Sequence, residues 1–568
     1  MFSKRNFTCA IIINIYFLFL CLFFSHLRYG AIDDYFMAGL LSGIYGNEFN
    51  VHLPFVNAIY GYALLPLYHL FPQISWYYIG EIASIFISLT IISYYLIDKM
   101  ELHWGCILSS LLVAAYAKDM YVVLQFTQCA EVLSAAGMIF LLFSFEHLNR
   151  SKSKKIFWIV ALIGLNLLWW GSLMRWEAFL MGMPFFAATL FLCVKKFWFV
   201  RKYVILTLLL LFAGSLGFYA FNQSQYQSPE YKAFKEFQPF RVLLGDGSFY
   251  NEQAIYEDLQ EMDLQPTDFD MLKKWVFYDN EVFVPESVQT ITRLTSAYTT
   301  RPHIKSYPLM ILQSFLNIAH TPIFIIWLVF SLILIFSNIQ KSCYLWIYLT
   351  LIALAFCCLL YVNRLVYRVE VGLFLYATVQ TMFFWKKMPK ISLKAVGIAM
   401  VALVIFSGFT FYNNRTVFLS PNNATTVLTD KLLSVNGYDS LFAFMESKPD
   451  SVVFVVPMDT YMDMTEHRLP PYTNEPMGNW QRIIPCGFWT PYFPDVEQSF
   501  RKRGVTNPIK DVVKENVYFI NDITYKLSLI DFLEMHHFKH VQVDTIKNFQ
   551  DIYILKYFVV QDTMEAKE

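Results

Sequence analysis

Long apolar runs alternate with short charged turns over the first 412 residues of the chain. Eleven of these runs are long enough to cross a hydrocarbon core of about 30 Å. They cover residues 8–27, 76–97, 104–124, 127–146, 156–174, 178–194, 203–221, 308–337, 343–362, 370–386 and 393–412. The pattern therefore predicts a polytopic α-helical membrane protein with about 11 transmembrane helices.

A twelfth apolar segment, residues 54–71, decides the topology. It is short and is interrupted by Gly61 and Pro66. The dense basic clusters lie at 149–155, 195–202 and 386–394. Cytoplasmic loops usually carry an excess of Lys and Arg. If residues 54–71 crossed the membrane, every later loop would change side, and the three basic clusters would lie outside the cell. We therefore expect 54–71, and the weakly apolar stretch 35–45 before it, to form helices at or dipping into the outer interface.

This topology places the N-terminus in the cytoplasm and two long polar segments outside the cell membrane. The run after Lys4 and Arg5 is too long for the apolar core of a signal peptide, so we expect it to be a retained first helix. The first outer segment, 222–307, shows helical spacing at 251–261 and 268–278. A Pro-containing turn is expected between them, at 265–267.

The second outer segment, 413–568, changes character from the apolar runs before it. Short runs rich in β-branched or aromatic residues predict strands at 451–458, 517–520 and 551–560, and 525–536 has helical spacing. Two domains are therefore predicted. Residues 1–412 form the transmembrane domain, and residues 413–568 form a small extracytoplasmic α/β domain.

Composition narrows the function classes. Hydrophobic residues make up 56% of the chain, against about 45–50% in typical soluble domains. The formal net charge is zero, so nothing indicates a nucleic-acid partner. The nine cysteines show no metal-ligand spacing, and no Walker or dinucleotide-binding motif is present. We predict no metal site and no required cofactor.

The candidate catalytic residues are Asp33 and Asp34, which follow the first apolar run directly. Neighbouring side chains diverge, so the two carboxylates are expected to differ in role. Asp34 precedes a helical stretch and is predicted to be its N-cap. Asp33 is then left to accept a proton from an acceptor hydroxyl. Two solvated loop acids are the alternative.

Arg175 and Arg368 lie at the outer ends of apolar runs and are the candidate ligands of a donor phosphate. A guanidinium binds phosphate oxygens in a bidentate manner, and a charge at this depth in a membrane is costly enough to indicate function. The alternative is a salt bridge within each short loop, with Glu177 and Glu370 as the respective partners.

Other polar residues are candidates for acceptor contacts or for lining a cavity. Glu131 lies about one turn inside its predicted helix, close to two glutamines. In the outer segment 222–307, Arg241, Asp246 and Trp275 are plausible contacts for an acceptor. His52 has no His or Cys at ligand spacing, so a zinc site is not expected there.

The chain resembles the GT-C superfamily of membrane glycosyltransferases, the class of the protein O-mannosyltransferases and of the aminoarabinose transferase that modifies lipid A. The resemblance is carried by Asp33-Asp34 after the first helix, by the interfacial helices, and by His52-Leu53-Pro54-Phe55, which is similar to the family's His-Pro-Pro-Leu without its second proline. Residues 77–99 and 125–155 also match the family's pattern. The likeness covers about the first 200 residues and is architectural beyond them.

The resemblance implies an inverting transfer from a polyprenyl-phosphate sugar donor to an extracytoplasmic glycan, lipid or protein acceptor, with a carboxylate base near Asp33. Two other classes stay open. A transporter or flippase is also polytopic, although it usually shows two similar halves. A membrane-anchored glycan-binding or assembly protein would use a sugar-stacking surface in its tail. That surface would consist of Tyr461, Tyr472, Trp480 and Trp489.

Overall fold

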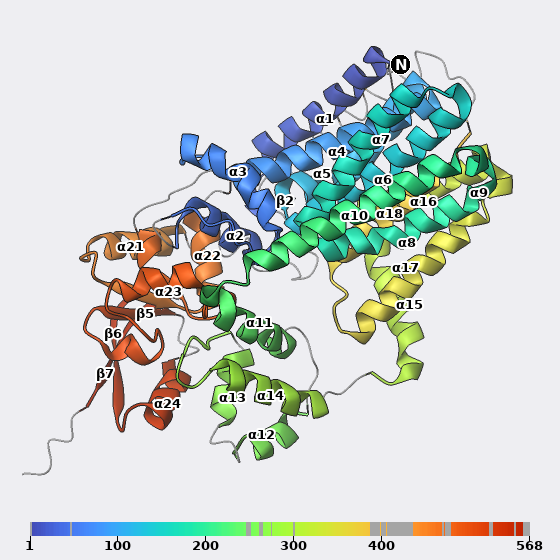
Figure 1. Ribbon diagram of the computed structural model, residues 1–568. Coiled ribbons are helices and arrows are strands. Elements are labelled where there is room, and N and C mark those ends of the chain that lie inside the picture. The colour runs from blue at the N-terminus through green and yellow to red at the C-terminus, as the bar shows by residue number, and fades with distance from the viewer. Residues whose placement is uncertain are drawn as a thin grey trace, which may run out of the picture.

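The computed structural model contains a bundle of long helices that is joined at one end to a mixed sheet (Figure 1). It describes residues 3–25, 27–45, 48–245, 251–260, 265–273, 275–298, 302–386, 398, 401, 405, 435–468, 471, 479–521, 526–549 and 552–560. Helix α2 (Ile32–Ser42) lies at the end of the bundle that faces the sheet, and α23 (Pro494–Arg501) lies beside the strands of the sheet.

Seven helices among the described residues are long and apolar enough to cross a membrane, or eight if a bent pair counts as one span. The seven are Lys4–Phe24 (α1), Trp76–Met100 (α4), Leu102–Val122 (α5 at Leu102–Ala117 with its π-helical end), Phe126–Ser151 (α6), Lys154–Met174 (α7), Val194–Gln225 (α9 at Val194–Phe197, α10 at Arg201–Gln225) and Ile339–Tyr361 (ending in α17, Tyr344–Tyr361). The chain is a multi-pass membrane protein.

Helix α6 forms the centre of the bundle and is buried along nearly its whole length, because α4, α7, α8 and α18 pack around it. A Cβ atom added at Gly137 of α6 would lie 2.7 Å from the carbonyl oxygen of Gly164 on α7. The two helices therefore approach at a pair of glycines, as small residues allow between membrane helices.

Several of the eleven expected spans differ in the structure. The run 308–337, expected as one span, forms α15 (Tyr307–Ala319) and α16 (Pro322–Ser337), bent by 92°. Pro322 cannot continue the preceding helix, and Thr321 caps α16 by accepting a hydrogen bond from Phe324 N. Runs 178–194 and 370–386 form the shorter helices α8 (Trp176–Leu192) and α18 (Tyr367–Met382). Almost all of run 393–412 lies outside the described residues.

The two segments that were expected to be interfacial helices are helical, and their place relative to the membrane stays a prediction. Residues Ile32–Ser42 form α2, and Ala58–Leu70 form α3. With 13 residues, α3 is about 20 Å long, which is too short to cross the hydrocarbon core. This length agrees with a segment 54–71 that does not cross.

The described part of the outer segment 222–307 is mostly helical, and residues 276–284 form a loop. The segment contains α11 (Lys232–Gly245), α12 (Glu252–Gln260), α13 (Pro266–Lys273) and α14 (Pro285–Ala297). The expected turn at 265–267 is wrong, because Pro266 is the first residue of α13, a position that suits its fixed φ. The helix expected over 268–278 ends at Lys273.

The C-terminal region contains a five-stranded sheet with the order β4-β3-β5-β7-β6. Strands β3 (Val453–Val456), β5 (Val517–Asn521) and β7 (Ile552–Val559) confirm the three predicted strands, and α24 (Lys526–His536) confirms the predicted helix. Two strands were not predicted. Strand β4 (Ile483–Pro485) has only three residues, and β6 (Val541–Phe549) is mostly exposed, so neither has a clear apolar pattern. The helices α21, α22 and α23 span Val435–Glu446, Met458–Arg468 and Pro494–Arg501.

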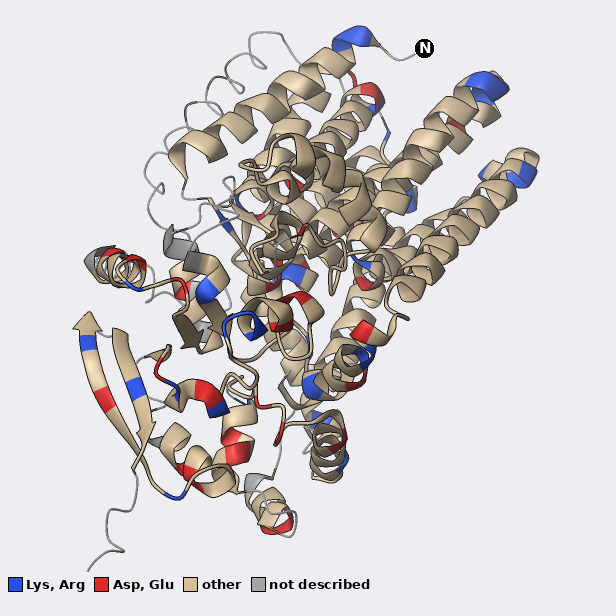
Figure 2. Cartoon of the chain, turned by 60° about the vertical axis from the view of Figure 1, so that its left-hand side comes forward, with Lys and Arg blue, Asp and Glu red and all other residues tan. Residues whose placement is uncertain are grey.

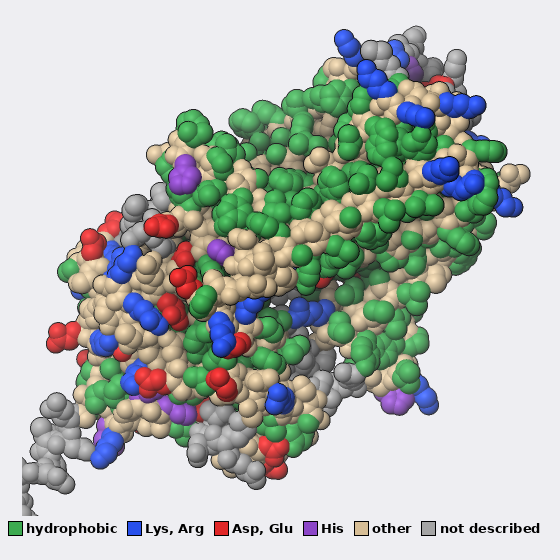
Figure 3. All heavy atoms as spheres, in the orientation of Figure 1, with side chains coloured by type: hydrophobic (Ala, Val, Ile, Leu, Met, Phe, Trp, Pro, Cys, Tyr) green, Lys and Arg blue, Asp and Glu red, His purple; other side chains and the backbone are tan. Residues whose placement is uncertain are grey.

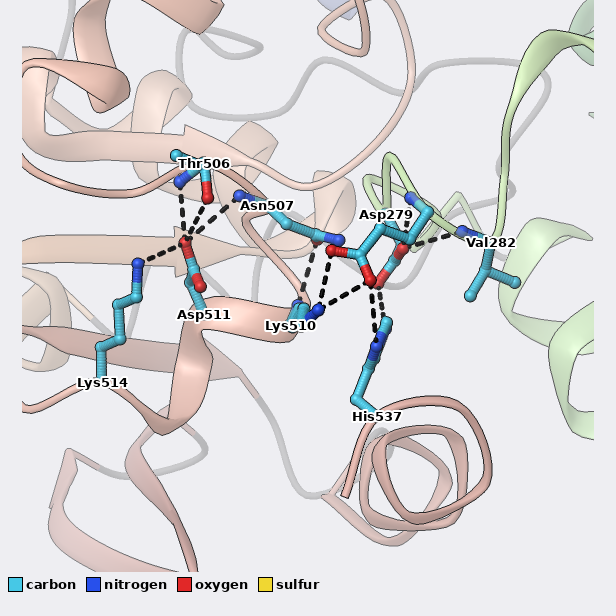
Figure 4. Close-up of polar contacts among 9 residues, drawn as sticks. Asp279, Val282, Thr506, Asn507, Lys510, Asp511, Lys514 and His537 are labelled. Atoms are coloured by element: carbon cyan, nitrogen blue, oxygen red, sulfur yellow. Dashed lines mark hydrogen bonds and ion pairs between the residues drawn. The ribbon is translucent and has the colours of Figure 1, made fainter.

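Buried charges join the outer segment to the C-terminal region (Figure 4). His537 Nε2 lies 2.7 Å from Asp279 Oδ2, and both side chains are almost completely buried. His536 Nε2 lies 3.0 Å from Asp268 Oδ2 in the same way. Burial alone would raise the pKa of Asp279, but hydrogen bonds from His537 and Asn507 hold that pKa below its usual range.

We expect His537→Ala to lower the melting temperature of the detergent-solubilised protein at pH 7, because it removes a hydrogen bond to a charged group worth about 1.5–3 kcal/mol. A carboxyl with a lowered pKa contributes stability above its ordinary pKa of about 3.9 and loses it as the pH falls further. The difference from wild type should therefore shrink below about pH 4. His540→Ala, at an exposed histidine of the same region, is the control. Equal melting shifts for the two variants would contradict the assignment.

Charge is distributed unevenly along the bundle. Lys and Arg mark the helix ends farthest from the sheet (Figure 2), while hydrophobic side chains cover the bundle surface between (Figure 3). At the far end, Arg150 and Lys196 pair with Glu146 at 2.6 and 2.8 Å. By the positive-inside tendency, the prediction that this end faces the cytoplasm stays as the charge pattern gave it.

The predicted sidedness is tested by an introduced Ser151→Cys, at an exposed position of the basic cluster 149–155. In a background without the exposed Cys343 and Cys358, we expect a membrane-impermeant maleimide to label this site only after permeabilisation. Ser447→Cys, exposed in the C-terminal region, should react in intact cells. Labelling of Ser151→Cys from outside would reverse the topology.

Candidate active site

The acidic pair is placed by a short parallel β-bridge between two distant segments. Arg28–Tyr29 (β1) pairs with Val123–Leu124 (β2), and Gly30 N donates to Leu124 O at 2.6 Å. A Cβ at Gly30 would lie 3.1 Å from the Val123 side chain, so the approach favours glycine. The bridge fixes the start of α2 beside the start of α6.

Asp34 is not the N-cap that the sequence predicted. Helix α2 begins at Ile32 with Ala31 as its N-cap, so Asp34 is the third helical residue, and it is completely buried. Asp34 Oδ1 accepts hydrogen bonds from Tyr77 Oη at 2.9 Å and from Phe126 N at 3.2 Å. The carboxyl group therefore fastens α2 to α4 and α6 instead of capping its own helix.

Asp34 also faces a second buried acid. Its carboxyl group contacts that of Glu81 on α4, which is equally buried. Among the described residues, no donor reaches Asp34 Oδ2 or either oxygen of Glu81. Burial, followed by the charge of Asp33, raises the pKa of Asp34 well above its usual range. Two carboxyl groups this close disfavour simultaneous ionisation, so the pair favours a state in which a proton is retained.

Asp33 is half-buried and makes a contact that the sequence did not predict. Its Oδ1 accepts a hydrogen bond of 2.9 Å from Nε1 of Trp489. Trp489 lies in the C-terminal region, shortly after strand β4. Trp489, Trp480 and Tyr461 are all buried, so these three do not form the exposed sugar-stacking surface of the binding-protein alternative. The fourth residue of that surface, Tyr472, lies outside the described residues.

Arg175 lies at the junction of α7 and α8, and its role as a phosphate ligand stays a prediction. Its Nε is 2.8 Å from Glu177 Oε2, so the salt bridge exists, although Glu177 is 71% exposed. Its guanidinium carbon also lies 4.9 Å from the ring centre of Phe55 and 5.2 Å from that of Phe126. The Arg175 side chain is 23% exposed.

One aromatic cluster, Phe55, Phe126 and Trp489, connects the acid with the arginine. Phe55 stacks on Phe126 with ring centres 5.6 Å apart, and it meets Trp489 edge-to-face at 4.4 Å. Arg175 contacts the first two rings, and Asp33 is bonded to the third. Residues from positions 33, 175 and 489 are therefore brought to one place.

Arg368 and Glu131 form a second charged group on the contact between α6 and α18. Glu131 is completely buried, and a Cβ at Gly372 of α18 would lie 2.1 Å from its carboxyl carbon. Arg368, one turn earlier on α18, is the cation whose charge acts on Glu131. The expected ion pair of Arg368 with Glu370 is not found among the described residues. Glu131 thus faces a helix that carries Arg368.

His52 is placed between α10 and the outer segment. Its Nδ1 lies 2.7 Å from Asn50 Oδ1 and its Nε2 lies 3.2 Å from Gln225 O, while its ring stacks on Tyr231. Burial lowers the pKa of His52. Both ring nitrogens are therefore engaged within the protein, which is typical of a residue that holds segments together.

Arg241 and Trp275 lie in the contact between the outer segment and the C-terminal region. Arg241 is 1% exposed, and its guanidinium carbon is 4.4 Å from the ring centre of Trp275 and 4.3 Å from that of Trp489. Their assignment as acceptor contacts stays a prediction. Arg241 contacts both tryptophans, and Trp489 in turn donates a hydrogen bond to Asp33. Asp246 lies outside the described residues.

The fold and this site define a multi-pass membrane protein in which an acid, several arginines and a tryptophan of the C-terminal region meet near one end of the helix bundle. No family model matches the sequence, and no curated protein matches it.

Among the solved structures similar to the chain are two of one protein. One is ArnT from Cupriavidus metallidurans in the apo state, with 10% identity and a TM-score of 0.43 over 96% of this chain and 97% of that chain. The other is the same protein bound to undecaprenyl phosphate, with 10% identity and a TM-score of 0.40 over 97% and 98%. Both alignments run across almost the full length of the two chains at low sequence identity. A likeness at this TM-score does not by itself assign an activity.

Proposed function

We propose that the chain is a membrane glycosyltransferase that moves a sugar from a polyprenyl-phosphate donor to an acceptor outside the cell membrane. The observation that carries the proposal is the convergence of Asp33 and Arg175 on the cluster of Phe55, Phe126 and Trp489. An acid near an arginine at the end of a membrane bundle meets the two requirements of this transfer: a base for the acceptor and a cation for the leaving phosphate.

In the proposed reaction, Asp33 takes the proton of the acceptor hydroxyl. The acceptor oxygen then bonds to the anomeric carbon as the bond from that carbon to the phosphate oxygen breaks, and the configuration inverts. The electron pair leaves with the polyprenyl phosphate. Arg175, and Arg368 from the neighbouring charged group, are the proposed ligands that stabilise the charge developing on that phosphate.

The division of roles between the two acids supports Asp33 as the base. Asp34 is completely buried, and its carboxyl group already accepts hydrogen bonds from Tyr77 and Phe126, so it is poorly placed to reach an acceptor. Asp33 is half-buried and lies one residue away, at the first turn of α2, where the helix dipole favours an ionised carboxylate.

The activity is tested with purified protein and polyprenyl phosphates that carry different single sugars. We expect one donor to release free polyprenyl phosphate when an extract of cell-surface glycolipids is supplied as acceptor. Mass analysis of the surface glycans and lipids of cells lacking the protein identifies the acceptor by the sugar it has lost. Unchanged glycans and lipids, together with no donor turnover, would contradict the proposal.

A further inference from the structure

The C-terminal region reaches the candidate base through the loop between β4 and α23, residues 486–493. Two of its residues, Phe488 and Tyr492, have positive φ angles of 65° and 62°. Such angles are costly for bulky side chains and persist only where the surroundings impose them. The loop is therefore held in a defined shape that directs Trp489 toward α2.

Contacts on both sides of the loop impose this shape. Cys486 O accepts hydrogen bonds from Phe277 N at 2.9 Å and Tyr278 N at 3.2 Å, both in the outer segment. At the other end of the loop, Phe493 packs edge-to-face on Phe36 of α2 and on Tyr231. The loop is thus fixed to the outer segment and to α2 at once.

Trp489 lies between a cation, Arg241, which contacts its ring, and a carboxylate, Asp33, which accepts a hydrogen bond from its N–H. The guanidinium carbon of Arg241 lies 4.3 Å from the ring centre, and Nε1 donates to Asp33 Oδ1 at 2.9 Å. A cation over an indole face withdraws electron density from the ring, which strengthens the N–H as a donor. Arg241, Trp489 and Asp33 therefore form one polarised chain that ends on the candidate base.

We propose that Trp489 is a positioning residue for Asp33, so that the C-terminal region completes the active site of the transmembrane domain. This inference rests on the proposed function. The indole N–H donates a hydrogen bond to Asp33 Oδ1. This bond fixes the orientation of the carboxylate and favours its ionised form. Charged groups near Asp33 include Asp34 on the same helix, Arg241 on α11 and, across Phe55, Arg175.

The test compares Trp489→Phe with Trp480→Phe. Phenylalanine at 489 keeps an aromatic ring against Phe55 and Arg241 but has no N–H. Trp480 is an equally buried tryptophan of the same region, packed on Phe442 and Tyr461, and is the matched control. We expect Trp489→Phe to lower kcat about tenfold with little change in KM, and to move the acidic limb of the pH–rate profile upward by about one pH unit. Trp480→Phe should leave both unchanged.

A second readout does not depend on transfer. A hydrophobic carbodiimide reacts with protonated carboxyl groups, so the pH at which labelling of Asp33 falls to half, followed by mass spectrometry, reports the protonation of Asp33. We expect this midpoint to rise in Trp489→Phe and to return toward the wild-type value in Trp489→His, which restores a ring N–H donor. The histidine variant also tests the inference if phenylalanine reduces the folded yield.

An unchanged labelling midpoint in Trp489→Phe, or an equal change in Trp480→Phe, would overturn the role of Trp489. If the wild-type protein transfers no sugar but the midpoints behave as expected, the proposed function fails while the contact between the tryptophan and the acid stands.

Discussion

Asp33→Asn is expected to lower the rate of sugar transfer by roughly 10²- to 10⁴-fold, the usual contribution of a general base. Asparagine has nearly the same shape and can still accept the hydrogen bond from Trp489 through its amide oxygen. The variant should therefore fold with a yield and melting temperature close to those of wild type. Transfer is measured as release of polyprenyl phosphate from the donor found active with the wild-type protein.

Asp34→Asn is the matched control, because it makes the same change one residue away. The amide oxygen can keep the bonds from Tyr77 and Phe126, and the amide nitrogen can donate to Glu81. We expect at most a modest loss of activity and stability. Losses of equal size in the two variants would refute the separate roles of Asp33 and Asp34.

The membrane part of the fold was largely predictable because apolar runs report directly on spans. The limits of α1, α4, α6 and α7 fall within a few residues of those expected, and α2 and α3 are helices where helices were predicted. The errors have local causes. Hydropathy does not register a helix break, so the apolar run that contains Pro322 was read as one span although the chain bends there by 92°.

The candidate site was only partly predictable, because its contacts join segments that are far apart in the chain. Asp33 and Arg175 are recognisable as charges beside apolar runs, a local signal. The bond from Trp489 to Asp33 joins residues 456 positions apart, and no pattern near either residue reports it. Asp34 shows the same limit. Asp34 was predicted to be an N-cap because it directly precedes a stretch with helical spacing. In the structure its carboxyl group instead accepts hydrogen bonds from Tyr77 and Phe126.

Glu81 illustrates what sequence reading passes over in an apolar helix. It is the one acidic residue between Trp76 and Ile97, and a lone carboxyl within a predicted span is a signal of a buried polar partner. That signal was present but pointed to no particular residue. The contact with Asp34 became visible only when α2 was placed against α4.

Arg175→Ala is expected to weaken use of the lipid-linked donor by about two orders of magnitude, and Arg175→Lys by roughly one to two. A charged hydrogen bond is worth about 1.5–3 kcal/mol, and lysine keeps the charge but loses the planar fork that binds two phosphate oxygens. The loss should appear as an increased donor KM and a lower kcat/KM for the donor. Acceptor affinity should change little, and added acceptor should not restore the rate.

The salt bridge with Glu177 provides the decisive comparison. Glu177 is 71% exposed and the pair lies on one short turn, and such exposed pairs typically contribute less than about 1 kcal/mol. Glu177→Gln should therefore leave donor use and detergent-solubilised yield near wild type if Arg175 binds phosphate. If the main role of Arg175 is to form this salt bridge, Glu177→Gln should be as damaging as Arg175→Ala. Both variants should then lose activity because less folded protein is obtained. A loss confined to yield in all three variants would remove Arg175 from the donor site and leave Arg368 as the remaining candidate for the phosphate.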